Sequence, residues 1–258
     1  MSVRRVALGV LASLMAFGGM HPIAIAEVVQ KGSIRVHFKG RLAPTALPRD
    51  RPVPVRVEVG ATVTSLRDSD PPRLKRISIA INGAGRFSPG ALPVCAMRDI
   101  QPSTTQNAIK ACGPSLVGSG SFAAKVLLPQ QAAFPAAGKL YAFNGRYRGH
   151  AAILAHVYGT EPVPTSFTLP FVMSTRKGDF GTVLTTSLAQ ATGNSGYITE
   201  LSLELGASGR SRQGAYLTAD CPAPNGFGGA TFPFARATFE FAHSALNSTL
   251  IRNCEVRR

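Results

Sequence analysis

The chain has 258 residues, with 28 Lys and Arg against 13 Asp and Glu, and therefore a formal net charge of +15. Apolar residues make up 45% of the sequence, and Trp is absent. This share of apolar residues is enough for a packed core, so the composition excludes a disordered chain.

Residues 1–26 have the pattern of a cleavable signal peptide. Arg4 and Arg5 precede an uncharged run from Val6 to Met20, and Ala24-Ile25-Ala26 fits the small-x-small rule for signal peptidase. The run is shorter than the ~20 apolar residues that span a bilayer, so cleavage is favoured over an uncleaved anchor. We predict cleavage before Glu27, no integral membrane span afterwards, and a mature chain that is secreted or held at the cell envelope.

Apolar residues alternate with polar or small ones along the mature chain, which predicts strands that bury one face. The clearest such segments are Ile34-Val36-Phe38, Val55-Val57-Val59, Ile77-Ile79-Ile81, Leu201-Leu203-Leu205 and Phe239-Phe241. Further strands are expected over residues 116–128, 139–143, 151–158, 166–173, 181–188, 216–219 and 248–252. Asn144-Gly145 is the strongest hairpin signal and Asn82-Gly83 the second, because both residues of each pair accept the positive φ of a type I′ turn.

The four cysteines are Cys95, Cys112, Cys221 and Cys254, and an even number in an exported chain indicates two disulfides. Three pairings are possible. We favour Cys95–Cys112 with Cys221–Cys254, because each pair lies within a compact stretch of strand and turn signals. A zinc site is not favoured, since the sequence has no C-x-x-C motif and no histidine beside a cysteine.

One mature segment is predicted to be helical. It covers residues 104–111, with Ser103 or Thr104 as the N-cap and Gly113-Pro114 as the stop. The helix lies within the favoured Cys95–Cys112 loop, and we expect that disulfide to strap it to the edge of a sheet.

The predicted strands are about ten residues apart, are joined by Pro- and Gly-rich turns, and do not alternate with helices. This arrangement predicts an all-β fold, an antiparallel β-sandwich of immunoglobulin-like or jelly-roll-like type with one short helix in a disulfide loop. We expect a single large β-sandwich domain over residues 27–258. Residues 129–138, rich in Pro, Gln and Ala, are interpreted as a long loop, and a boundary between two domains there is the alternative.

No residues form a recognisable cofactor-binding set, so no cofactor is expected. Gly118 to Ala123 fits the letters of the dinucleotide-binding pattern, but Pro129 ends the segment and no acidic residue follows before Glu161. We interpret the segment as a strand of small residues. Glu200 and Glu204 share one face of a predicted strand about 13 Å apart, too far for a pair of glycosidase carboxylates.

The histidines give no metal site, because His150 and His156 would lie about 20 Å apart on one strand. A catalytic triad assembled from distant strands stays open, since triads are defined by geometry and not by order. His150, His156 and Ser195 are the residues whose substitution would test such a dispersed site. We regard an enzyme as the less favoured interpretation.

The basic charge is spread along the chain. Without Arg4 and Arg5, 26 basic residues stand against 13 acidic ones, a net charge of +13. The clusters Arg73-Lys75-Arg76, Arg146-Arg148 and Arg210-Arg212 lie in or beside predicted turns, which is typical of a solvated face. Nucleic acid is not an expected partner, because its readers interleave aromatic residues with basic ones and the chain is expected to be exported. Anionic cell-envelope polymers or lipid headgroups are the favoured partners.

Five short stretches carry a resemblance to other proteins: Leu92-Pro93-Val94-Cys95, Ile100-Gln101-Pro102-Ser103-Thr104-Thr105, Ala111-Cys112, Ala142-Phe143-Asn144-Gly145 and Tyr158-Gly159-Thr160-Glu161-Pro162-Val163-Pro164. With these stretches, most of the mature chain resembles an uncharacterised group of exported, disulfide-containing β-rich proteins from high-GC bacteria. The resemblance implies no activity and no site residues. It implies that the mature region is one unit with two cysteine pairs.

Two functions follow as expectations. The leading one is an exported cell-envelope or extracellular β-sandwich that acts as a non-enzymatic binding or structural module, with anionic envelope polymers as the expected ligand. The alternative is a secreted hydrolase with a dispersed catalytic site.

Overall fold

The computed structural model describes residues 26–67, 70–127, 129–160, 164–188, 196–206, 210–211 and 214–257. The predicted signal peptide lies outside the described residues apart from Ala26, and Ser195 lies outside them too. None of the helices in this described part is long and apolar enough to cross a membrane.

Most of the described chain is β-strand, and thirteen of the described strands form one sheet. The mostly β fold predicted from the sequence is confirmed. Strands β18 and β3 pair in parallel, and the other described strand pairs of this sheet, such as β2 with β5, are antiparallel. In sheet order the strands are β1 (Ala26–Lys31), β2 (Ile34–Ala43), β5 (Arg56–Ser65), β13 (Gly196–Leu205), β8 (Leu116–Val126), β9 (Phe134–Tyr147), β10 (His150–Gly159), β11 (Thr165–Thr175), β12 (Phe180–Ser187), β6 (Arg76–Asn82), β17 (Gly229–Glu240), β18 (Ala245–Val256) and β3 (Ala46–Leu47).

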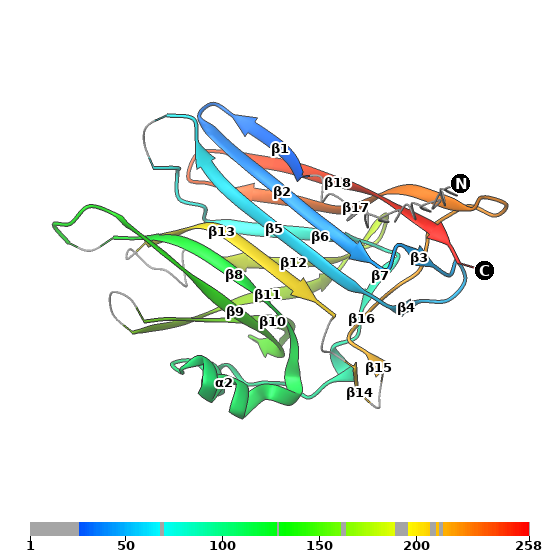
Figure 1. Cartoon of the computed structure of the whole chain (residues 1–258), viewed down its shortest axis with the longest axis horizontal. Helices are drawn as coiled ribbons and strands as arrows, with labels where there is room; N and C mark the ends of the chain where they lie inside the picture. The colour runs from blue at the N-terminus through cyan, green and yellow to red at the C-terminus, as the bar shows by residue number, and fades with distance from the viewer. Residues whose placement is uncertain are drawn as a thin grey trace, which may run out of the picture.

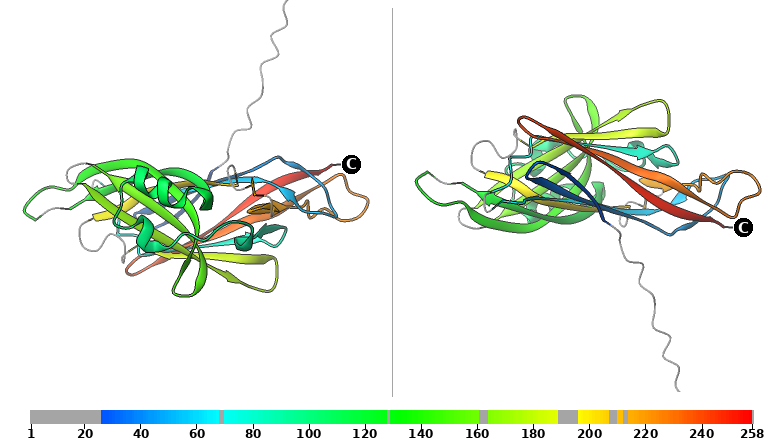
Figure 2. Two further views of the ribbon diagram at one scale, coloured as in Figure 1. Left: turned by 90° about the horizontal axis from the view of Figure 1, so that it is seen from below. Right: turned by 90° about the horizontal axis from the view of Figure 1, so that it is seen from above.

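The sheet curls until its two halves face each other (Figures 1 and 2). Strands β1, β2, β5, β13 and β8 lie in one layer, and β12, β6, β17 and β18 lie in the other. The first strands of the sheet therefore reach the last: β1 and β2 contact β18, and Arg252 Nε on β18 donates to the Gly40 carbonyl on β2 at 2.8 Å. Both layers belong to one continuous sheet, and these contacts bring its two ends together.

The apolar alternation of the sequence fills the space between the layers. On β2, Val36 and Phe38 are buried inside, so the side chains of their neighbours point to the outer face. Phe38 meets Phe239 of β17 edge-on, with ring centroids 5.7 Å apart. This contact joins the two layers through the core.

The predicted hairpin turn at Asn144-Gly145 is wrong. Both residues lie inside β9, paired with Ile153 and Ala152 of β10, and the turn falls at Arg148 and Gly149, which have φ of 49° and 83°. The Asn144 side chain is fully buried and donates to the carbonyls of Pro89, Leu92 and Pro93 at 2.9, 3.1 and 3.0 Å. The role of this asparagine is therefore to bond a distant backbone segment, and not to form a turn.

The second turn signal, Asn82-Gly83, does mark a turn. Asn82 ends β6, and its Oδ1 accepts a hydrogen bond from the Ala84 backbone N–H at 2.9 Å. The chain then enters β7 (Gly85–Phe87), which pairs with β16 (Leu217–Ala219) and not with β6. β4 (Val53–Pro54) pairs with the other side of β16, and β14 (Arg210–Ser211) pairs with β15 (Gly214–Ala215).

The expected long loop over residues 129–138 is shorter than predicted. Phe134 begins β9 and pairs with Val126 at the end of β8. The segment between them therefore joins two neighbouring antiparallel strands, and residues 134–138 belong to the sheet.

Two disulfides are present, Cys95–Cys112 and Cys221–Cys254, which are the two pairs favoured from the sequence. Between Cys95 and Cys112 lie the one-turn helix α1 (Met97–Ile100) and the predicted helix, α2 (Thr105–Cys112). The Thr104 hydroxyl caps α2 by accepting from the Asn107 N–H at 3.3 Å. Single turns of 3-10 helix occur at η1 (Pro89–Ala91) and η2 (Gly113–Ser115).

The disulfide loop does not lie at the edge of the sheet. It packs on the outer face of β9 and β10, which are central strands, and buries Ile100 and Ala108 against Phe143 and Leu154. The prediction that the helix lies at the edge of the sheet is wrong because β10 is apolar on both faces. Ile153 faces the interior, and Leu154 faces outward. A strand with two apolar faces needs a cover on each, and the helices supply the outer one.

Candidate functional site

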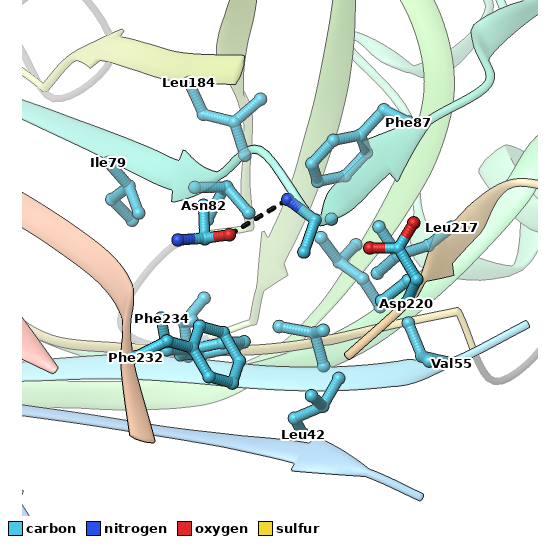
Figure 3. Close-up of a pocket in the computed structure, with 17 residues that line it drawn as sticks. Leu42, Val55, Ile79, Asn82, Phe87, Leu184, Leu217, Asp220, Phe232 and Phe234 are labelled. Atoms are coloured by element: carbon cyan, nitrogen blue, oxygen red, sulfur yellow. Dashed lines mark hydrogen bonds between the residues drawn. The ribbon is translucent and has the colours of Figure 1, made fainter. Parts of the chain in front are cut away.

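Two small cavities lie in the described part of the interior between the layers. Each has a volume of about 30 Å³, which is space for only one or two waters. Figure 3 shows the first of them, where apolar side chains such as Leu42, Phe232 and Leu217 converge from different strands. Nearly all of its lining is apolar, so the cavity belongs to the core.

The structure does not bring together His150 and His156, the two histidines of the dispersed hydrolase hypothesis. His150 is exposed at the start of β10, and His156 is fully buried further along the same strand. Ser195 lies outside the described residues. The described chain also contains no group of three or more His, Cys, Asp or Glu side chains placed to hold a metal ion.

The structure confirms two other sequence predictions, a strand of small residues and an outward-facing pair of glutamates. Gly118 to Ala123 lies within β8, as a strand of small residues should. Glu200 and Glu204 lie on the outer face of β13, where Glu204 forms an ion pair with Arg56 at 3.4 Å.

An open polar groove lies on the outer face of the second layer, and we call it the hairpin groove. It has a volume of about 530 Å³. Its floor comes from the neighbouring strands β12, β6 and β17, and one wall is the turn between β11 and β12. Its lining consists of Ser78, Ala80, Arg176, Lys177, Asp179, Phe180, Val183, Arg236, Thr238 and Glu240.

Cations face the hairpin groove from two sides. Arg176 and Lys177 are exposed in the β11–β12 turn, and Arg236 is exposed on β17. The guanidinium carbon of Arg236 lies 4.6 Å from the centroid of the Phe180 ring, a cation–π contact that holds this side chain over the groove. Asp179 and Glu240 also line it, but Glu240 forms an ion pair with Arg76 at 3.5 Å. The lining therefore has an excess of positive charge.

The hydroxyl groups of the groove differ in what they can offer. Thr238 donates its proton to Asn247 Oδ1 at 2.7 Å, so its hydroxyl cannot also donate to an anion. Ser78 and Thr185 share a hydrogen bond of 3.1 Å between their hydroxyls, in which either can be the donor. When Thr185 donates, the Ser78 proton is free to point into the groove.

A second groove, of about 610 Å³, runs between α1 and the outer face of β11. Met97 and Gln101 line it from the disulfide loop, and Pro170 and Thr168 line it from the sheet. The Thr168 hydroxyl is buried without a hydrogen-bond partner, as are both ring nitrogens of His156, its cross-strand partner on β10. Because these polar atoms are closed off from solvent, a ligand in the groove does not reach them.

Burial lowers the pKa of His156, and the nearby Ile100 backbone opposes this only in part. The imidazole is therefore neutral at pH 7. Its cross-strand partner Thr168 carries a buried hydroxyl, but no hydrogen bond joins the two side chains.

The sequence analysis does not single out Arg176, Lys177 or Arg236. A local signal existed for the first two, because Arg176-Lys177-Gly178 lies between two predicted strands and so predicts a basic turn. No local signal could place Arg236 beside Phe180, since the two are joined only through the pairing of β12, β6 and β17.

Comparison with known proteins adds no relative to this description. No protein-family model, no curated protein and no solved structure matches the chain.

Proposed function

We propose that the chain is a non-enzymatic binding module that acts outside the cytoplasm and holds anionic groups of a cell-envelope polymer in the hairpin groove. The observation that carries this proposal is the placement of Arg176, Lys177 and Arg236 around one open groove of about 530 Å³. The two disulfides are compatible with an extracytoplasmic location. The signal-peptide pattern of residues 1–26 supports export.

The chemistry of the groove favours anions over neutral ligands. Arg and Lys side chains bind phosphate and carboxylate through charge-assisted hydrogen bonds, which are stronger than neutral ones. Arg236 is held by Phe180, so less side-chain entropy is lost when it binds. A net charge of +13 on the mature chain adds long-range attraction for a polyanion.

We also infer that the curled sheet belongs with the β-sandwich proteins, because its layers pack through interdigitated apolar side chains such as Phe38 and Phe239. The immunoglobulin-like and jelly-roll-like assignments stay predictions.

The test is binding of short-chain inorganic polyphosphate to the purified mature protein, measured by titration calorimetry at low and moderate salt. We expect salt-sensitive binding in which the affinity of the hairpin groove falls at least tenfold in the triple variant Arg176→Gln, Lys177→Gln, Arg236→Gln. A charge-matched control, Arg98→Gln, Lys110→Gln, Arg148→Gln, removes three cations that do not line the groove and should retain most of the affinity.

The outcomes separate the possible sources of the anion. Equal losses in the groove variant and the control would show that total charge, and not the hairpin groove, governs binding. Vesicles of phosphatidylglycerol, compared with phosphatidylcholine, test lipid headgroups in the same buffer. Binding to the vesicles without binding to polyphosphate would overturn the polymer proposal.

A further inference from the structure

The outer face of the first layer carries a separate row of basic side chains along β2, which we call the β2 row. Arg35, His37 and Lys39 occupy alternate positions of β2, between the buried residues Ile34, Val36 and Phe38. Alternate residues of a strand share one face, so the row points away from the core.

The neighbours of the β2 row are uncharged on both sides. Across β1, the three residues pair with Gln30, Val28 and Ala26. Across β5, they pair with Thr64, Thr62 and Gly60. No carboxylate occupies either flanking position, and the next basic residue of the strand, Arg41, is the one that forms an ion pair, with Glu58 at 2.9 Å.

Two contacts hold the ends of the row in place. Arg35 donates from Nη2 to Gln30 Oε1 at 3.3 Å. The stem of Lys39 lies over Gly60, where a Cβ atom would come within 3.0 Å of Lys39 Cε. The glycine therefore lets the lysine lie along the sheet surface with its charged end in solvent.

The spacing of the row selects a linear ligand. Alternate residues of a strand are about 6.6 Å apart, so the row extends for about 13 Å. A small anion contacts at most two neighbouring members at a time. An extended polyanion lying along β2 reaches all three, and each further contact adds to its affinity.

The β2 row and the hairpin groove lie back to back. Phe38, which stands between His37 and Lys39, packs in the core against Phe239, which stands between the groove residues Thr238 and Glu240. The side chains flanking each phenylalanine point the opposite way from its ring. The two cationic surfaces therefore face outward from opposite layers, separated by an apolar core.

We infer that one molecule of this protein holds two anionic polymer chains, one on each layer, and so crosslinks them. This inference rests on the proposed function of the hairpin groove and adds a second, independent polymer site. The apolar core between the layers prevents a single short chain from reaching both surfaces directly.

The experiment measures binding and crosslinking separately on the mature protein. Light scattering follows the mixing of protein with long-chain inorganic polyphosphate, and calorimetry follows the binding of short chains. Wild-type protein should form large assemblies near a fixed ratio of protein to polymer. These assemblies should be lost when polymer is in excess, because each polymer chain then carries at most about one protein molecule and no network extends. Sedimentation of the protein alone establishes that it does not already self-associate.

Variants of each surface decide the result. The β2-row variant carries Arg35→Gln, His37→Gln and Lys39→Gln together. This variant and the groove triple variant should each still bind short chains at fewer sites, while the light scattering falls at least tenfold. The Arg98→Gln, Lys110→Gln, Arg148→Gln control loses the same number of basic residues as either variant and should still crosslink. If either surface variant crosslinks like wild type, or if the control loses crosslinking equally, the two-surface inference is wrong. Absence of short-chain binding in wild type would instead contradict the proposed function itself.

Discussion

His156 is a buried polar residue whose ring lies close to the Ile100 backbone. Its ring is enclosed on the outer face of β10 beneath the disulfide loop, and both ring nitrogens lack hydrogen bonds. The buried Thr168 hydroxyl opposite it is also without a partner. Burying such groups costs folding free energy, so this part of the molecule is held by the apolar contacts and the disulfide around it.

The stability of the fold should therefore depend on pH. Burial lowers the pKa of His156 below its ordinary 6.5, so the unfolded chain takes up a proton at a higher pH than the folded one. The free energy of unfolding then decreases as pH falls below about 6.5, by up to about 1.4 kcal/mol per pH unit. Chemical denaturation at several values between about pH 5 and 8 measures this slope.

His156→Leu removes the titrating group while keeping an apolar side chain beneath α1, and it should flatten the slope. The exposed His150→Gln is the matched control and should leave the slope unchanged. A wild-type slope that persists in His156→Leu would assign it to other groups.

At the scale of elements, two glycines decide how closely β8 and β13 approach. A Cβ atom on Gly118 would lie 2.0 Å from the Glu204 carbonyl oxygen, and one on Gly120 would lie 1.9 Å from that of Ser202. These obstructing atoms belong to the backbone of a paired strand and cannot rotate away. The pattern that imitates a dinucleotide-binding motif in the sequence is thus a requirement of strand packing.

Gly120→Ala should destabilise the protein by about 3 kcal/mol or more, at or above the upper end of the usual cost of overpacking, because β8 and β13 must move apart. Gly113→Ala is the control, since a Cβ atom there meets nothing within 4 Å and the backbone is helical. Urea denaturation of both variants measures the difference. Equal stabilities would show that the sheet absorbs the extra carbon without cost.

At the scale of the whole molecule, the two disulfides act on different parts. Cys221–Cys254 ties the segment after β16 to β18 near the end of the sheet, across 33 residues of sequence. Cys95–Cys112 closes a 17-residue separation and fastens the helices to the outer face of β9 and β10. Loss of the first should loosen the closure of the sheet, and loss of the second should free its outer cover.

Replacing each pair by serine should lower the free energy of unfolding by about 4 kcal/mol for Cys221–Cys254 and about 3 kcal/mol for Cys95–Cys112, from the loop entropy of the unfolded chain. Hydrogen exchange should show faster exchange confined to residues 95–112 and their contacts in the second variant. Global loss of protection there would mean that the disulfide loop is part of the cooperative core.

The sequence alone predicts most of the long strands, a helix at residues 104–111 that the structure places at Thr105–Cys112, and the inward and outward faces, because alternation and capping are local signals. It also supplies the basic charge and the even number of cysteines. Only the tertiary structure decides that the strands form one curled sheet and that the helices cover central strands. It also decides that the Asn144 side chain bonds the backbone of residues 89–93 and does not form a turn. It alone brings Arg236 to Phe180 and sets the β2 row behind the hairpin groove. These features depend on which strands pair, and pairing is governed by contacts between residues far apart in the chain, which no local pattern encodes.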